Sequence, residues 1–144
     1  MKIGLLNGPN LNLLGKREPG IYGNFTLDDV FNSLKIIAGK SHEIMAFQSN
    51  SEAELINFIQ LAESDGIEYI IFNAGAYTHT SVALRDAISS VNTKVIEVHI
   101  SNIHKREEFR QHSYLAPVCI GQISGFGMKS YEMALYYILE QTKK

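Results

Sequence analysis

A glutamate and a histidine two positions apart, Glu97 and His99, lie in the apolar run KVIEVHI. Such a run is typical of a buried β-strand, in which side chains two positions apart point to the same face. A histidine held by a carboxylate can give or take a proton near neutral pH. The same pair could also be a core histidine satisfied by its neighbour. The position of His99 at the carboxyl end of the run favours proton transfer.

An arginine and a tyrosine, Arg17 and Tyr22, share the segment GKREPGIYGN, which its glycines and proline mark as bending. The segment belongs to a connection of about 20 residues, from Asn7 to Thr26, whereas strand-to-helix loops usually take roughly 2 to 6. Its leucine, isoleucine and aromatic side chains can anchor it to the rest of the protein, whereas a solvated linker lacks such side chains. We therefore predict a lid that closes over a site.

Polar side chains follow directly after three apolar runs of strand length. Asn10 comes after the first run, Asn73 after the third and Ser101 after the fourth. In an open parallel sheet, ligands bind beyond the carboxyl ends of the strands, where the strand order reverses. We expect a binding site at this edge, with Arg17 and Arg110 within reach.

Five apolar runs alternate with helical patterns along the chain. The predicted strands are Lys2 to Leu6, Glu43 to Phe47, Tyr69 to Phe72, Val95 to Ile100 and Val118 to Ile123. Stripes with helical spacing begin at Leu27, Leu55, Leu84 and Tyr131, and a short helix is expected over Ile103 to Arg110. Strands that alternate with helices indicate a parallel sheet covered on both faces. We predict an α/β fold, a flavodoxin-like three-layer sandwich with a five-stranded parallel sheet.

The composition is that of a globular chain, and 144 residues suffice for one sizeable core, so we expect a single catalytic domain over residues 1–144. A formal net charge of -2 provides no positive electrostatic potential that would attract nucleic acid or an anionic membrane. No run approaches the roughly 20 apolar residues of a spanning helix. Cys119 is the only cysteine, which excludes an intrachain disulfide and a thiolate metal cluster. We expect a cytoplasmic protein.

A phosphorylated receiver module is the main alternative to an enzyme. Such a module needs aspartates at the ends of its first and third strands, where this chain has Asn7 and Asn73. An asparagine cannot accept the phosphoryl group in that way. The stretch GQISGFG does not have the order of the dinucleotide fingerprint, which disfavours nucleotide binding. An enzyme acting on a small polar molecule fits better, with Tyr22 or His99 moving protons.

Three segments closely resemble the signature regions of the type II 3-dehydroquinate dehydratases. They are NGPNLNLLGKREPGIYG (Asn7 to Gly23), NAGAYTHTSVALRDAI (Asn73 to Ile88) and EVHISNIHKREEFRQHSYLAPV (Glu97 to Val118). Ala74 stands where that family often has proline, and Gln111 where it often has histidine. The resemblance implies reversible loss of water from 3-dehydroquinate to give 3-dehydroshikimate. It further implies a stepwise anti elimination through an enolate, without metal or organic cofactor.

The resemblance also implies catalytic roles for five residues. The tyrosine that matches Tyr22 removes a proton beside the ketone, and the arginine that matches Arg17 lies on the same mobile lid. Asn10 matches the region that stabilises the enolate. His99 matches the general acid that protonates the departing hydroxyl, and Glu97 its neighbouring carboxylate. Because a nearby cation favours a phenolate, a closing lid can assemble base and cation while excluding water.

Substrate-binding positions carry over in the same way. Asn73 and the backbone at Ile100 and Ser101 match the carboxylate-binding positions of the family. His79 and Arg110 match residues that hold the ring hydroxyls. The resemblance therefore implies separate positions for the carboxylate and for the ring hydroxyls of the substrate.

Asp86 matches a residue that reaches the active site of a neighbouring subunit. The helical spacing of Leu84, Ala87 and Ile88 leaves Asp86 off the apolar stripe, which fits that role as well as that of a solvated carboxylate. The family forms trimers that assemble into dodecamers, and we expect the same homo-oligomer here. Aromatic amino acid biosynthesis by the shikimate pathway and quinate breakdown both use the reaction, and the sequence leaves the two open.

Overall fold

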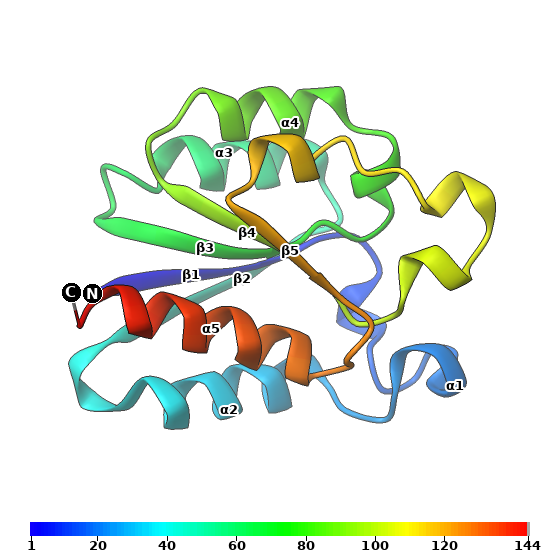
Figure 1. Cartoon of the computed structure of the whole chain (residues 1–144), viewed down its shortest axis with the longest axis horizontal. Coiled ribbons are helices and arrows are strands. Elements are labelled where there is room, and N and C mark those ends of the chain that lie inside the picture. Colours follow the sequence, from blue (N-terminus) through cyan, green and yellow to red (C-terminus); the bar gives the residue numbers. More distant parts are fainter. Residues whose placement is uncertain (144) are drawn as a thin grey trace.

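One parallel sheet of five strands forms the centre of the computed structural model, which describes residues 1–143 (Figure 1). The strands are β1 (Lys2–Asn7), β2 (Glu43–Gln48), β3 (Ile67–Asn73), β4 (Lys94–His99) and β5 (Gly121–Ser124). Their order in the sheet is β2-β1-β3-β4-β5, and every neighbouring pair is parallel. This is the order of flavodoxin-like folds, so the predicted fold is confirmed.

Helices cover both faces of the sheet (Figure 1). One face carries α2 (Leu27–Ala38) and α5 (Lys129–Gln141), and the other carries α3 (Glu52–Leu61) and α4 (Val82–Ser89). A single helical turn, α1 (Pro19–Tyr22), lies in the connection after β1. Among the helices of residues 1–143, none has both the length and the apolarity that crossing a bilayer requires.

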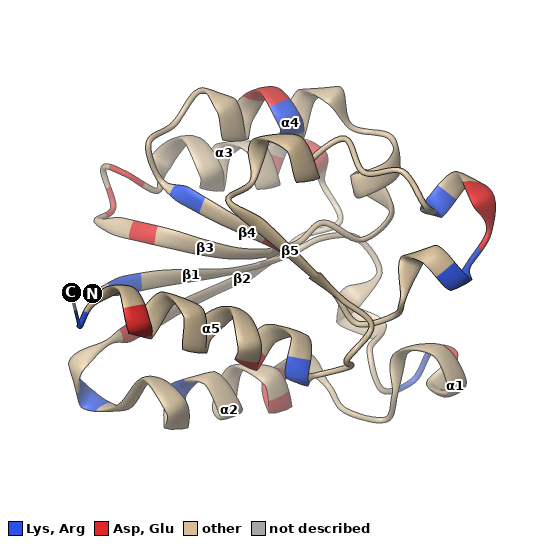
Figure 2. Ribbon diagram, in the orientation of Figure 1, with Lys and Arg blue, Asp and Glu red and all other residues tan. Residues whose placement is uncertain are grey.

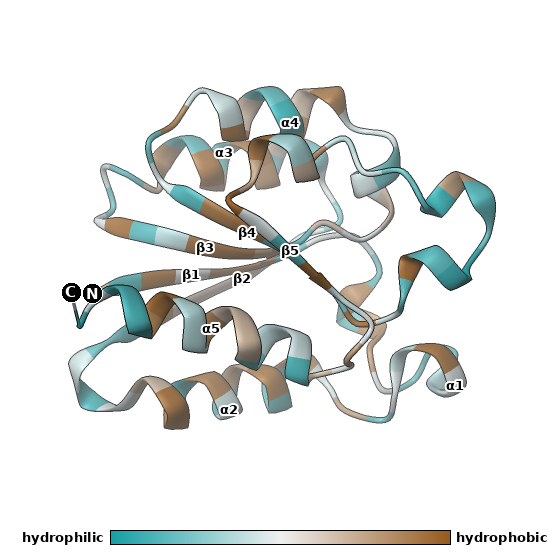
Figure 3. Ribbon diagram, in the orientation of Figure 1, coloured by the Kyte–Doolittle hydropathy of each residue, from teal (hydrophilic) through white to brown (hydrophobic). Residues whose placement is uncertain are grey.

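The strands are buried on both faces, which explains their nearly continuous apolar sequences. In β4, Val95 packs in the core beneath α3 and α4, whereas Ile96 and Val98 pack in the core beneath α2 and α5. Figure 3 shows the hydrophobic residues along β3 and β4 and the mainly polar loop after β4. The alternation predicted for this strand is therefore observed, and it puts Glu97 and His99 on the face of Val95.

Two helix starts show how side chains satisfy the first N–H groups. Thr26 and Asp29 form a reciprocal capping box at α2. Ser51 caps α3 by accepting the N–H of Glu54, but the Glu54 carboxylate accepts the Ser49 hydroxyl instead of returning to Ser51. The Ser51-x-x-Glu54 pattern is typical of a capping box, and here only half of that box is formed.

Two elements differ from the sequence prediction. The last strand begins at Gly121 instead of Val118, because the hydroxyl of Ser113 accepts the N–H groups of Leu115 and Ala116 and starts a 3-10 turn, Ala116–Val118. Cys119 therefore lies just before the strand. The predicted helix over 103–110 is two 3-10 turns, Ile103–Lys105 and Glu108–Arg110, since Arg106 between them has extended backbone.

A buried tyrosine on α5 joins the carboxyl ends of β1 and β3. The Tyr131 hydroxyl donates to Asn7 Oδ1 at 2.6 Å and accepts from Asn73 Nδ2 at 2.9 Å. Burial raises the pKa of this phenol well above its ordinary value, so the hydroxyl keeps its proton and remains a donor. The two asparagines that end these strands are thereby fixed.

We predict that Tyr131→Phe lowers the free energy of unfolding by about 1 to 3 kcal/mol, because it leaves two buried amide groups without a partner. Urea unfolding at fixed protein concentration measures the change. Tyr136→Phe is the matched control, since Tyr136 lies on the same helix with 56% of its surface exposed. Equal stability of the two variants would show that the Tyr131 hydroxyl does not hold the strand ends.

Candidate active site

A cavity of about 150 Å³ lies beyond the carboxyl ends of β1, β3 and β4. Nine of the predicted site residues line it: Asn10, Arg17, Tyr22, Asn73, His79, His99, Ile100, Ser101 and Arg110. Glu97 lies behind His99 in the wall. Asp86 is exposed on α4 and does not line this cavity in the described part of the chain.

Glu97 and His99 form a buried pair at the end of β4. Glu97 Oε2 is 2.6 Å from His99 Nε2 and accepts Gln122 Nε2 at 2.7 Å, while Oε1 accepts the Ser113 hydroxyl at 2.8 Å. Burial alone would raise the pKa of this carboxyl, but the hydrogen bonds from His99, Gln122 and Ser113 outweigh burial and hold the pKa below its ordinary value. The carboxylate is thus ionised at neutral pH, so His99 Nε2 donates to it and Nδ1 is left for the cavity.

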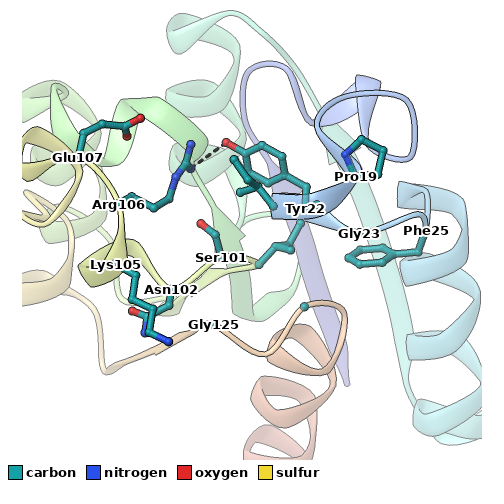
Figure 4. Close-up of a pocket in the computed structure, with 14 residues that line it drawn as sticks. Pro19, Tyr22, Gly23, Phe25, Ser101, Asn102, Lys105, Arg106, Glu107 and Gly125 are labelled. Atoms are coloured by element: carbon teal, nitrogen blue, oxygen red, sulfur yellow. Dashed lines mark hydrogen bonds between the residues drawn. The ribbon is translucent and has the colours of Figure 1, made fainter.

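The segment predicted to act as a lid borders the cavity through Leu11, Arg17 and Tyr22. Leu11 and Leu14 are buried and anchor it, and α1 places Tyr22 in the cavity wall. The Tyr22 hydroxyl accepts a hydrogen bond from Arg106 Nη1 at 2.8 Å (Figure 4). The Arg17 and Arg106 guanidinium carbons lie 4.8 and 5.2 Å from the centre of the Tyr22 ring. Two cations therefore flank this phenol.

Arg106 lines the cavity although the sequence analysis did not predict it. Its segment has the composition of a solvated helix face, and of the arginines in this segment only Arg110 was predicted to reach the site. The extended backbone at Arg106 turns its side chain toward the lid, and Gln111 Nε2 donates to the Arg106 carbonyl at 3.1 Å. A cation in the loop directly after β4 was the available signal, since that loop borders the predicted site.

The turn after β1 is held in a tight conformation at the cavity. Asn10 has left-handed backbone with φ 69°, and its N–H donates to Asn50 Oδ1 at 3.0 Å. Gln48 Nε2 donates to the Gly8 carbonyl at 3.1 Å. A Cβ atom at Gly8 would lie 2.5 Å from the Ala74 carbonyl oxygen, so only glycine fits there. These contacts fix Asn10 at the cavity wall.

Asn73 and His79 come from the end of β3 and the 3-10 turn Gly75–His79 that follows it. Asn73 Oδ1 accepts the Gly75 N–H at 3.1 Å, and its Nδ2 keeps one N–H beyond the bond to Tyr131. His79 Nδ1 lies 2.8 Å from the His112 carbonyl. Burial lowers the pKa of His79 and outweighs that hydrogen bond, so the ring is neutral at pH 7. Nδ1 therefore carries the proton, and Nε2 is free to accept a hydrogen bond.

The charge around the cavity is positive. Arg17, Arg106 and Arg110 line it, and no Asp or Glu is among its lining residues in the described chain. Arg110 Nε also donates to Glu107 Oε2 at 2.6 Å, in the loop where basic and acidic residues gather (Figure 2). Within residues 1–143, no group of three or more His, Cys, Asp or Glu side chains could hold a metal ion. The arrangement suits a small anion with hydroxyl groups.

A wider opening of about 700 Å³, the outer groove, adjoins this cavity (Figure 4). Four residues line both spaces: Tyr22, Ile100, Ser101 and Arg106. The hydrogen bond between Tyr22 and Arg106 therefore lies at the boundary between the cavity and the groove.

Comparison with known proteins gives one consistent result. The sequence model of the family described as dehydroquinase class II matches residues 1–139. A 3-dehydroquinate dehydratase of Bacillus pumilus is 52% identical over 138 residues, covering 95% of this chain and 93% of its own. The corresponding protein of Idiomarina loihiensis is 56% identical over 135 residues, covering 93% of this chain and 89% of its own. The crystal structure of a type II dehydroquinase from Butyrivibrio crossotus superposes with a TM-score of 0.92 at 50% identity, covering 95% and 96% of the two chains.

Proposed function

The chain belongs to the class II dehydroquinase family, and we propose on that premise that it removes water from 3-dehydroquinate, through an enolate, to give 3-dehydroshikimate. The family predicted from the three signature segments is confirmed. The observation that carries the proposal is the presence of two proton-transfer groups on one small cavity, Tyr22 from the lid and His99 from β4. Separate acid and base groups suit a stepwise anti elimination, reversible like any hydration equilibrium.

Tyr22 is the base in this proposal. Its oxygen accepts a hydrogen bond from Arg106, and Arg17 lies over its ring, so positive charge surrounds the atom that must become anionic. A guanidinium beside a phenol oxygen stabilises the phenolate form. The phenolate then takes the proton from the carbon next to the ketone, and the electron pair moves onto the ketone oxygen as an enolate.

The enolate needs fixed donors, because its negative charge develops in a site closed to bulk solvent. Asn10 is held in place by Asn50 and lies at the cavity wall, where it acts on the enolate oxygen through a bridging water. Collapse of the enolate then expels the hydroxyl, which His99 protonates from Nδ1. Glu97 stabilises the ring while it carries two protons.

Substrate recognition uses the remaining lining residues. The free N–H of Asn73 and the backbone N–H groups of Ile100 and Ser101 bind the substrate carboxylate. His79 Nε2 accepts a hydrogen bond from a ring hydroxyl, and Arg110 donates to another. The positive lining supports this assignment, since the substrate is an anion. The proposed reaction needs neither metal nor organic cofactor.

The proposal extends to assembly and cellular role. We place the enzyme in the cytoplasm as a single catalytic domain, without nucleic-acid or membrane partners, in aromatic amino acid biosynthesis or quinate breakdown. Asp86 is exposed and is not among the lining residues of the cavity in the described chain, which is compatible with a role in the site of a neighbouring subunit. Trimers that assemble into a dodecamer would supply such a neighbour.

Chelator-treated wild-type protein supplied with 3-dehydroquinate should form product, seen as absorbance of the conjugated enone. We predict that Tyr22→Phe loses most of this turnover while substrate binding persists, because only the proton acceptor is removed. Tyr137→Phe, on the exposed surface of α5, is the control and should keep full turnover. Near-normal turnover in Tyr22→Phe would exclude this tyrosine as the base.

Complementation tests the position of Asp86. Tyr22→Phe and Asp86→Ala proteins, each poorly active, are dissociated and reassembled together. Mixed trimers should regain activity above either parent, because some sites combine Tyr22 of one chain with Asp86 of the next. Absence of recovery in oligomers shown to be mixed, with Asp86→Ala shown to be impaired, would place Asp86 within its own subunit.

A further inference from the structure

We infer that Gln122 is a positioning residue for the acid step, acting on His99 through Glu97. The inference rests on the proposed function and adds a residue that touches neither the cavity nor the substrate. Glu97 Oε2 has two hydrogen-bond partners, His99 Nε2 at 2.6 Å and Gln122 Nε2 at 2.7 Å. The Glu97 oxygen that binds His99 is thus also held by Gln122, a residue of the neighbouring strand.

The sheet register produces this contact. Gln122 in β5 pairs directly with Glu97 in β4, and paired residues of parallel strands point to the same face. Glu97 has no exposed surface, so the donors that reach it must compensate for burying its charge. A shift of β5 by one residue would turn Gln122 to the other face and remove one of these donors.

The two neutral donors to Glu97 are held differently. The Ser113 hydroxyl accepts the N–H groups of Leu115 and Ala116, so the turn that follows fixes it on Oε1. Gln122 comes from the edge strand and binds Oε2, the oxygen that also meets His99. Ser113 therefore satisfies one carboxylate oxygen, while Gln122 sets the direction of the other.

An amide N–H can only donate, so Gln122 favours the ionised form of Glu97. The titratable groups facing Glu97 are His99, His79 and the Cys119 thiol, whose pKa burial raises to about 12. The thiol is neutral at assay pH, and burial lowers the pKa of His79. Loss of the Gln122 bond should then raise the pKa of Glu97, so the carboxylate would take up a proton at a higher pH. The protonated group would no longer accept the hydrogen bond from His99 as a carboxylate does.

The position of His99 in the reaction gives the inference a specific readout. Tyr22 removes the α-proton before His99 acts, so a fault in the Glu97–His99 pair slows loss of the hydroxyl and leaves enolate formation intact. A general weakening of the fold would slow both steps. Exchange of the α-proton with deuterated solvent measures the first step, and enone formation measures the whole reaction.

The test variant is Gln122→Met, which keeps the length of the side chain and removes the donor. We expect kcat for enone formation to fall about tenfold, the effect of losing one hydrogen bond to a charged group, with KM and α-proton exchange unchanged. The acid limb of the kcat profile should move up by about one pH unit. Gln60→Met, at an exposed position of α3, should match the wild type in all four measurements.

Gln122→Lys restores a donor and should recover kcat and return the acid limb to the wild-type pH or below it. Equal loss of exchange and elimination in Gln122→Met, or unchanged kcat and acid limb, would show that Gln122 serves only the sheet edge. If Gln122→Met does not fold, a Gln122→Lys protein with the kinetics of the wild type supports the inference, and one with slow elimination overturns it. Failure of the wild type itself to form the enone would instead refute the proposed function.

Discussion

Burial of the Glu97 charge is the constraint on which the arrangement of Glu97 and His99, the proposed acid side of the site, depends. Removing a carboxylate from water costs several kcal/mol unless donors compensate, and three side chains donate to this one. His99 comes from the same strand, Ser113 from the turn before β5 and Gln122 from β5 itself. The register of β4 with β5 and the course of the loop between them must therefore bring all three donors to the same carboxylate.

Tyr22, the proposed base, does not depend on strand register, because it lies on a segment outside the sheet. Leu11 and Leu14 anchor the lid in the core, while Tyr22 meets the body of the protein through Arg106. Arg106 belongs to the loop that directly follows His99 on β4. The same loop thus links the two groups proposed to transfer protons, and it also borders the outer groove.

Sequence patterns predicted the features that depend on local periodicity. The alternation in β4 put Glu97 and His99 on one face, and the polar residues after three strands lie together because parallel strands end at one edge. The start of β5 could not be predicted, since it depends on a turn formed by side-chain contacts such as Ser113 with Leu115. For Arg106 the sequence offers only its place in the loop after β4, because the direction of its side chain depends on the extended backbone at that residue. Gln122 was missed for a related reason: its partner depends on the pairing of β4 with β5, which no local pattern encodes.

In the proposed reaction, Tyr22 and His99 perform separate, successive proton transfers. The most direct measurement follows 3-dehydroquinate in deuterated solvent with His99→Ala protein, recording α-deuterium incorporation by mass spectrometry and enone absorbance in the same sample. The account predicts continued deuterium incorporation while enone formation falls by about 100-fold or more, the usual contribution of a general acid. Equal loss of both signals, with substrate still bound, would contradict it by showing that His99 also takes part in forming the enolate.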